Sequence, residues 1–97
     1  MGKVKTIMCT CPAGLGSSLI LQMNVEKALE KMGRSEIKCS HSSLGDTYRG
    51  CADLLVVSSD VYDQVKDYAP TIAIHNLVDK AHIEQTLREY FDANPEA

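Results

Sequence analysis

The chain contains no run of apolar residues approaching the ~20 that a helix needs to cross a bilayer. It also has no excess of basic residues, because ten Lys and Arg stand against thirteen Asp and Glu, for a formal net charge of -3. Non-specific binding to nucleic acid requires a basic surface, so the charge balance disfavours that class of function. Residues 1–5 do not resemble the start of a signal peptide, and we expect a cytoplasmic protein without direct membrane insertion.

Tryptophan is absent and phenylalanine occurs once, whereas cysteine occurs four times, at positions 9, 11, 39 and 51. In a cytoplasmic protein these side chains are expected to be thiols rather than disulfides. Their spacing matches neither a helical nor a knuckle pattern of metal ligands, so we predict no metal site and no cofactor. We interpret Cys9, Cys39 and Cys51 as small buried hydrophobic residues.

Segments with strand character alternate with segments of helical character, which predicts an α/β fold. The architecture expected is a small doubly wound four-stranded parallel sheet with helices on both faces, a Rossmann-like three-layer sandwich. Residues 1–93 are expected to form one domain and residues 94–97 a C-terminal tail. The expected strands span residues 3–9, 36–41, 53–58 and 71–74, and the expected helices span 17–32, 60–66 and a last segment that begins after Asp79.

Between the first expected strand and the first expected helix lies the run Cys11-Pro12-Ala13-Gly14-Leu15-Gly16-Ser17-Ser18. A thiol at such a turn faces the first backbone N–H groups of the helix, which have no partner within the helix. These donors and the helix dipole stabilise a thiolate, and they also bind an anion carried on the sulfur. Gly14 and Gly16 allow the backbone to curl tightly, while Ser17 and Ser18 offer capping and hydroxyl donors. The pattern therefore predicts phosphoryl chemistry on Cys11.

Three related motifs are incomplete in this run. A Walker phosphate loop requires a Lys after its glycines, and none is present. A dinucleotide fingerprint requires a third Gly, whereas Ser17, Ser18 and Leu19 follow Gly16. A thiol-dependent tyrosine phosphatase places an Arg six residues after its Cys to clamp the phosphate, and here that residue is Ser17. The missing Arg favours a protein that holds phosphate on sulfur over one that hydrolyses it rapidly.

Polar side chains follow each of the other expected strands. Because the carboxyl ends of parallel strands meet at one edge of the sheet, we expect these side chains to lie at the same edge as Cys11. These polar residues are Ser42 and Ser43, then Ser58, Ser59 and Asp60, and finally His75 and Asn76. The sequence leaves open whether Ser58, Ser59 or His75 borders the Cys11 thiol.

The order of a strand, the motif Cys-x-x-Gly-x-Gly-Ser-Ser and an amphipathic helix resembles the IIB component of the sugar phosphotransferase system (PTS). The likeness is to the ascorbate/galactitol branch, of the lactose-ascorbate type. It is carried by residues 16–25, which are similar to the segment after the active cysteine of ascorbate-type IIB proteins. Residues 52–59 are more loosely similar to the third strand and following loop of that family.

The resemblance implies that Cys11 accepts a phosphoryl group from a phosphohistidine on a IIA partner and carries it as phosphocysteine. The group then passes to a carbohydrate, expected to be ascorbate-like, that is bound by a membrane-embedded IIC partner during uptake. The implied phosphate cradle is the backbone of residues 12–18 with the hydroxyls of Ser17 and Ser18. One departure is Pro12, which has no N–H and removes one donor from that cradle. We expect a monomer, because one core uses the apolar faces identified.

Two other functions remain open from the sequence. One is a low-molecular-weight phosphatase or an arsenate-reductase-like thiol enzyme, which has a similar loop length but a clamping Arg that this chain lacks. The other is a module that senses redox state or metal through Cys9 and Cys11, which would point to the same side of a strand. Turnover of an aryl phosphate would favour the first, and stoichiometric zinc or a Cys9–Cys11 disulfide would favour the second.

Overall fold

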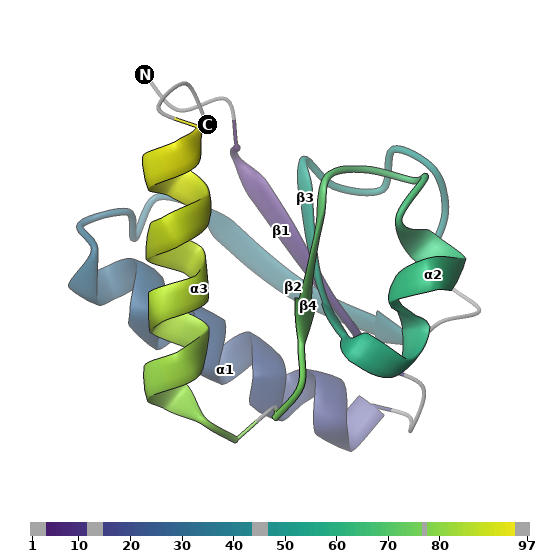
Figure 1. Cartoon of the computed structure of the whole chain (residues 1–97), viewed down its shortest axis with the longest axis horizontal. Coiled ribbons are helices and arrows are strands. Elements are labelled where there is room, and N and C mark those ends of the chain that lie inside the picture. The colour runs from purple at the N-terminus through teal and green to yellow at the C-terminus, as the bar shows by residue number, and fades with distance from the viewer. Residues whose placement is uncertain (1–3, 12–14, 44–46, 77, 95–97) are drawn as a thin grey trace.

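The sheet at the centre of the molecule has four parallel strands in the order β2-β1-β3-β4 (Figure 1). The computed structural model describes residues 4–11, 15–43, 47–76 and 78–94. The predicted α/β fold is confirmed, because α1 (Leu15–Lys31) and α3 (Lys80–Ala93) cover one face, and η2 (Ser59–Val61) and α2 (Tyr62–Val65) cover the other. The strands are β1 (Thr6–Cys11), β2 (Lys38–Ser43), β3 (Leu54–Ser58) and β4 (Thr71–Ile74).

Strand β3 is buried along its whole length because helices cover both of its faces. Successive side chains of a strand point to opposite faces, so β3 supplies residues to two apolar clusters. Leu55 and Val57 pack with Val61 and Val65 beneath η2 and α2. Leu54 and Val56 join the larger cluster beneath α1 and α3, which also contains Ile7, Cys9, Leu21, Val25, Leu29, Ile74, Ile83, Leu87 and Phe91.

Two strands lie further along the chain than the sequence pattern predicts. Strand β1 continues through Cys11 instead of ending at residue 9, and β2 continues through Ser43 instead of ending at residue 41. The reason is that the two strand ends pair with one another, Thr10 with Ser42 and Cys11 with Ser43. Cys11 is therefore the last residue of a strand rather than the first residue of a loop.

Local contacts set the end of α1 and the starts of the other two helical segments. Gly33, with φ of 75°, lies two residues after Lys31, the last residue of α1, and the Arg34 N–H donates to the Leu29 carbonyl at 2.8 Å, as in a Schellman ending. Asp79 caps α3 by accepting a hydrogen bond from the His82 N–H at 3.0 Å. The short segment after β3 is capped by Ser58, which accepts from the Asp60 N–H at 3.4 Å.

At the amino ends of the strands, Asp53 ties β3 to β1. Its Oδ2 accepts hydrogen bonds from the Lys5 N–H at 2.9 Å and the Thr6 N–H at 3.2 Å, and its own N–H donates to Thr6 Oγ1 at 3.1 Å. This contact sets where β1 begins, and therefore which residue of β1 reaches the opposite edge of the sheet.

Candidate functional site

The thiol of Cys11 lies where the winding of the sheet reverses. From β1 the chain moves to β2 on one side, and then crosses β1 to form β3 on the other side. Open α/β sheets bind ligands in the crevice outside the carboxyl ends of the strands at such a reversal. Cys11 is the last residue of β1 and is 1% exposed, so the residue singled out from the sequence lies at this switch point.

Helix α1 begins at Leu15, with only three residues between it and Cys11, and Figure 1 shows its start beside the carboxyl end of β1. The first turn of α1 contains no acidic residue that would oppose the positive end of the helix dipole. Ser18, in that turn, is fully buried. Of the remaining predicted cradle residues, Pro12, Ala13 and Gly14 lie outside the described residues, while Leu15, Gly16 and Ser17 form the helix start.

Three hydroxyl groups meet at the same edge of the sheet. Thr10 Oγ1 lies 3.4 Å from Ser42 Oγ and 3.1 Å from Thr47 Oγ1, and the last two oxygens are 3.1 Å apart. All three residues are buried. The sequence predicted Ser42 at this edge but not its partners, because Thr10 falls just after the expected strand of residues 3–9 and Thr47 lies in an irregular segment.

The other cysteines lie in apolar or half-buried surroundings. Cys9 is part of the larger core cluster, and burial, followed by the nearby Cys39 and Glu26, raises the pKa of its thiol well above the usual value. Burial, followed by Glu26, raises the pKa of Cys39 to about 12. Cys51 is half-buried against the smaller cluster. Cys9 and Cys39 are therefore protonated at neutral pH, and a protonated thiol is a poor nucleophile.

His41 has a defined hydrogen-bonding role that the sequence did not predict. Gln22 of α1 donates through Nε2 to the Cys39 carbonyl at 3.2 Å, so its Oε1 is the atom that faces His41 Nδ1. A carboxamide oxygen accepts only, so His41 donates to it through the proton on Nδ1. This contact joins α1 to the edge strand β2 one turn after Ser18.

The predicted polar residues after β3 and β4 make hydrogen bonds within their own turns. The Ser58 hydroxyl caps η2 and also donates to Asp60 Oδ2 at 3.4 Å, so both of these hydrogen bonds are made to Asp60 in the same turn. His75 and Asn76 are exposed and follow β4, which β3 separates from β1. The Asn76 side chain accepts from the Val78 N–H at 3.1 Å and closes its own turn.

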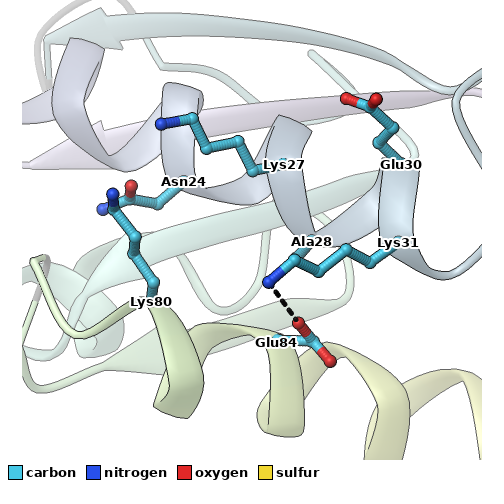
Figure 2. A pocket seen from close by; sticks show the side chains of 7 residues that line it. All are labelled: Asn24, Lys27, Ala28, Glu30, Lys31, Lys80 and Glu84. Carbon is cyan, nitrogen blue, oxygen red and sulfur yellow. Dashed lines mark ion pairs between the residues drawn. The ribbon is translucent and has the colours of Figure 1, made fainter.

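A groove of about 430 Å³ lies between α1 and α3, away from Cys11 (Figure 2). The ion pair between Lys31 Nζ and Glu84 Oε1, 3.6 Å apart, crosses it. Arg88 donates to Glu84 Oε2 at 3.0 Å and, with Lys31, lowers the pKa of that carboxyl. The groove is lined by Asn24, Lys27, Ala28, Glu30, Lys31, Lys80 and Glu84.

Within residues 4–11, 15–43, 47–76 and 78–94, no three His, Cys, Asp or Glu side chains are arranged to hold a metal ion. Over the same part of the chain, every helix is too short or too polar to span a membrane. All four cysteines are thiols, as predicted.

The fold and the site together define a small doubly wound domain that presents a thiol at the switch point of its sheet, directly before a helix. The family model described as PTS system, Lactose/Cellobiose specific IIB subunit, matches residues 6–89. Since the match covers most of the chain, the protein belongs to this family and is a component of a sugar phosphotransferase system. Curated proteins gave no match.

Family membership confirms the predicted identification as a PTS IIB component, whose general partners are IIA and IIC proteins. The description of the family names lactose and cellobiose, so the ascorbate/galactitol branch stays a prediction.

Proposed function

We propose that Cys11 is the phosphoryl acceptor of this IIB protein. The Cys11 thiolate attacks the phosphorus of a phosphohistidine on IIA, so that a P–S bond forms as the P–N bond breaks. The thiol proton passes to solvent before the attack, and the imidazole leaves as a neutral ring that keeps the proton already on its other nitrogen. In the second step a hydroxyl oxygen of the sugar on IIC attacks the phosphorus, the P–S bond breaks and the thiolate returns, while the hydroxyl proton passes to a base or to solvent.

The observation that carries this proposal is the place of Cys11 at the carboxyl end of β1, at the switch point and just before α1. Backbone N–H groups at a helix start stabilise the equatorial oxygens of a transferring phosphoryl group. The proposed cradle is the backbone of residues 12–18 with the hydroxyls of Ser17 and Ser18. Ser17 stands where a thiol phosphatase has its Arg, which agrees with holding the phosphoryl group rather than hydrolysing it.

The proposed docking surface for IIA is an apolar patch on α1, formed by Leu19, Ile20 and Met23. These side chains are 44%, 45% and 47% exposed and lie within about two turns of the helix start. Large exposed apolar side chains beside a site mark an interaction surface. Because the phosphohistidine of IIA must reach Cys11, IIA has to cover the molecular surface next to the start of α1.

The sugar, the localisation, the oligomeric state and the domain bounds are proposals as well. We propose an ascorbate-like sugar, supported by the likeness of residues 16–25 to ascorbate-type proteins. We also propose a cytoplasmic monomer whose domain spans residues 1–93, with 94–97 as a tail. The last helix ends at Ala93, which agrees with that boundary.

The test is the intact mass of the protein after incubation with phosphoenolpyruvate, the general phosphotransferase proteins and a matching IIA. We expect one phosphate adduct on the wild-type protein, no adduct on Cys11→Ser, and an adduct on Cys9→Ser. An adduct that persists in Cys11→Ser would refute the choice of nucleophile. The absence of an adduct with every IIA tested would refute the carrier function, and assays of aryl phosphatase activity and bound metal would then test the two alternatives.

A further inference from the structure

Thr10, Ser42 and Thr47 form a closed set of hydrogen bonds, which we call the hydroxyl ring. The three oxygen–oxygen distances are 3.1, 3.1 and 3.4 Å. A hydroxyl has one proton and two lone pairs, so each member can donate to one neighbour in the ring and accept from the other. The ring therefore links the three residues to one another.

The ring joins three parts of the chain at the point where the sheet ends. The register pairs between β1 and β3 run to Thr10 and Val57, and Cys11 pairs with Ser43 of β2. The residue that carries the thiol thus lies at the end of the sheet, directly after the last of these β1–β3 pairs. Thr10 immediately precedes it, and the Thr10 hydroxyl ties the strand end to Ser42 and to Thr47, across 32 and 37 residues of sequence.

The ring lies behind the thiol. Successive side chains of a strand alternate between faces, which places Thr10 on the face opposite Cys11. Because Cys9 belongs to the cluster under α1 and α3, Cys11 shares the α1 face and the ring lies on the α2 face. The ring therefore does not contact the reacting atoms, and it acts on Cys11 through the backbone of β1.

We propose that the hydroxyl ring of Thr10, Ser42 and Thr47 is a positioning device that fixes the Cys11 thiol relative to the start of α1 for phosphoryl transfer. This role rests on the proposed function, since it concerns the same thiol. Phosphoryl transfer depends on in-line placement, and a small displacement of the nucleophile slows it strongly. Burial of all three hydroxyls makes the ring costly to break, because a broken ring leaves unpaired polar groups away from water.

The experiment measures single-turnover transfer from phosphorylated IIA, over a range of IIA concentrations, to Thr10→Val and to Thr10→Ser. Valine has nearly the shape of threonine without the hydroxyl, and serine restores the hydroxyl. We expect Thr10→Val to lower the maximal transfer rate by about tenfold or more, with the half-saturating IIA concentration unchanged, because placement and not docking is lost. Thr10→Ser is expected to recover most of the rate.

Thr71→Val is the matched control. Thr71 also lies in a strand and loses one hydroxyl hydrogen bond, to the Ala69 carbonyl at 2.8 Å, but on the far strand β4. We expect its transfer rate to match the wild type. If Thr10→Val does not fold, Thr47→Val and Ser42→Ala remove the other two members and decide the question in its place.

A second readout does not need IIA. Alkylation of each cysteine by iodoacetamide, located by peptide mass spectrometry, reports how well the strand end holds the buried thiol. We expect Cys11 to react several-fold faster in Thr10→Val, while Cys9, in the core two residues earlier, stays protected. Equal exposure of both thiols would indicate general unfolding and would overturn the positioning role.

The outcomes separate the two proposals. If wild-type protein accepts no phosphate, the proposed function fails, and the alkylation pattern alone judges whether the ring holds Cys11. If Thr10→Val and Thr47→Val both transfer at the wild-type rate, or Thr71→Val is slowed as much as they are, the ring is not a positioning device. The same conclusion follows if Thr10→Ser fails to recover the rate.

Discussion

Replacing Cys9 separates the role of a core residue from that of a nucleophile. Cys9 and Cys11 lie two residues apart on one strand and on one face, so these two thiols are the pair that a test of the nucleophile has to tell apart. Cys9, however, is fully buried in the cluster that joins β1 to α1 and α3. We therefore expect Cys9→Ser and Cys9→Ala to lower stability and to leave phosphoryl acceptance intact, whereas Cys11→Ala abolishes acceptance.

The size of the stability loss follows from the burial. Cys9→Ser places a hydroxyl among apolar side chains, and a buried hydroxyl without a partner costs about 1–3 kcal/mol. Cys9→Ala removes the sulfur and leaves a small void, which costs about 1 kcal/mol. For a domain of this size, a loss of about 2 kcal/mol lowers Tm by roughly 8–16 °C. Such a loss is tolerable against a total stability of roughly 5–15 kcal/mol.

The assay pairs urea unfolding with intact-mass detection of the phosphate adduct, at a temperature well below the Tm of every variant. Cys51→Ser, which changes a half-buried thiol on the other face of the sheet, is the control and should lose less stability than Cys9→Ser. Loss of the adduct in a folded Cys9→Ala protein would refute the reasoning. So would a Cys9→Ser variant as stable as the wild type, because the core would then accept a polar group without penalty.

Two further predictions concern docking and pH. Ile20→Ser and Met23→Ser remove exposed apolar surface from the proposed IIA patch. In single-turnover kinetics, we expect both variants to need a higher half-saturating concentration of phosphorylated IIA, with the maximal transfer rate unchanged. Val78→Ser, at an exposed apolar side chain outside α1, is the control and should have no effect. Because folding raises the pKa of Cys39 to about 12, the unfolded chain loses that proton first, and the free energy of unfolding should fall between about pH 9 and pH 12. Urea unfolding across this range should show a shallower fall in Cys39→Ala; an equally steep fall would contradict the assignment.

Most of the fold could be predicted because its signals are local. The strand expected over residues 53–58 contains β3, an apolar run that is buried throughout. The helix expected over residues 17–32 stops just before Gly33, and the last expected helix begins after Asp79, where the structure has a glycine ending and a side-chain cap. These features depend on residues that are close to one another in the sequence, so they can be recognised without knowing the tertiary contacts.

The ends of β1 and β2 were predicted two residues short because the missing interaction is not local. Thr10 and Ser42 look like the polar start of a loop when each is considered alone. In the structure they face each other in register and, with Thr47, satisfy one another, which allows polar side chains to be buried at the strand ends. Similarly, nothing near His41 in the sequence indicates that Gln22 of α1 contacts it. The strand register had to be known before either contact was visible.

The proposed choice of Cys11 among four thiols rests on its position in the fold and not on residue type. A phosphoryl carrier with several reactive cysteines would lose its group to the wrong acceptor or form disulfides. Here burial disfavours two of the three competing thiols, because it raises the pKa of Cys9 and of Cys39 and so keeps both protonated at neutral pH. Cys11 differs from Cys9 by one step of the strand repeat, which moves it from the apolar core to the edge of the sheet at the start of α1. This placement of Cys11 requires β1 to end at a fixed residue. Asp53 fixes the start of β1 and the hydroxyl ring fixes its end, and neither belongs to the run of residues 11–18. Substitutions at these positions are therefore expected to alter phosphoryl transfer without touching the motif by which the cysteine was found.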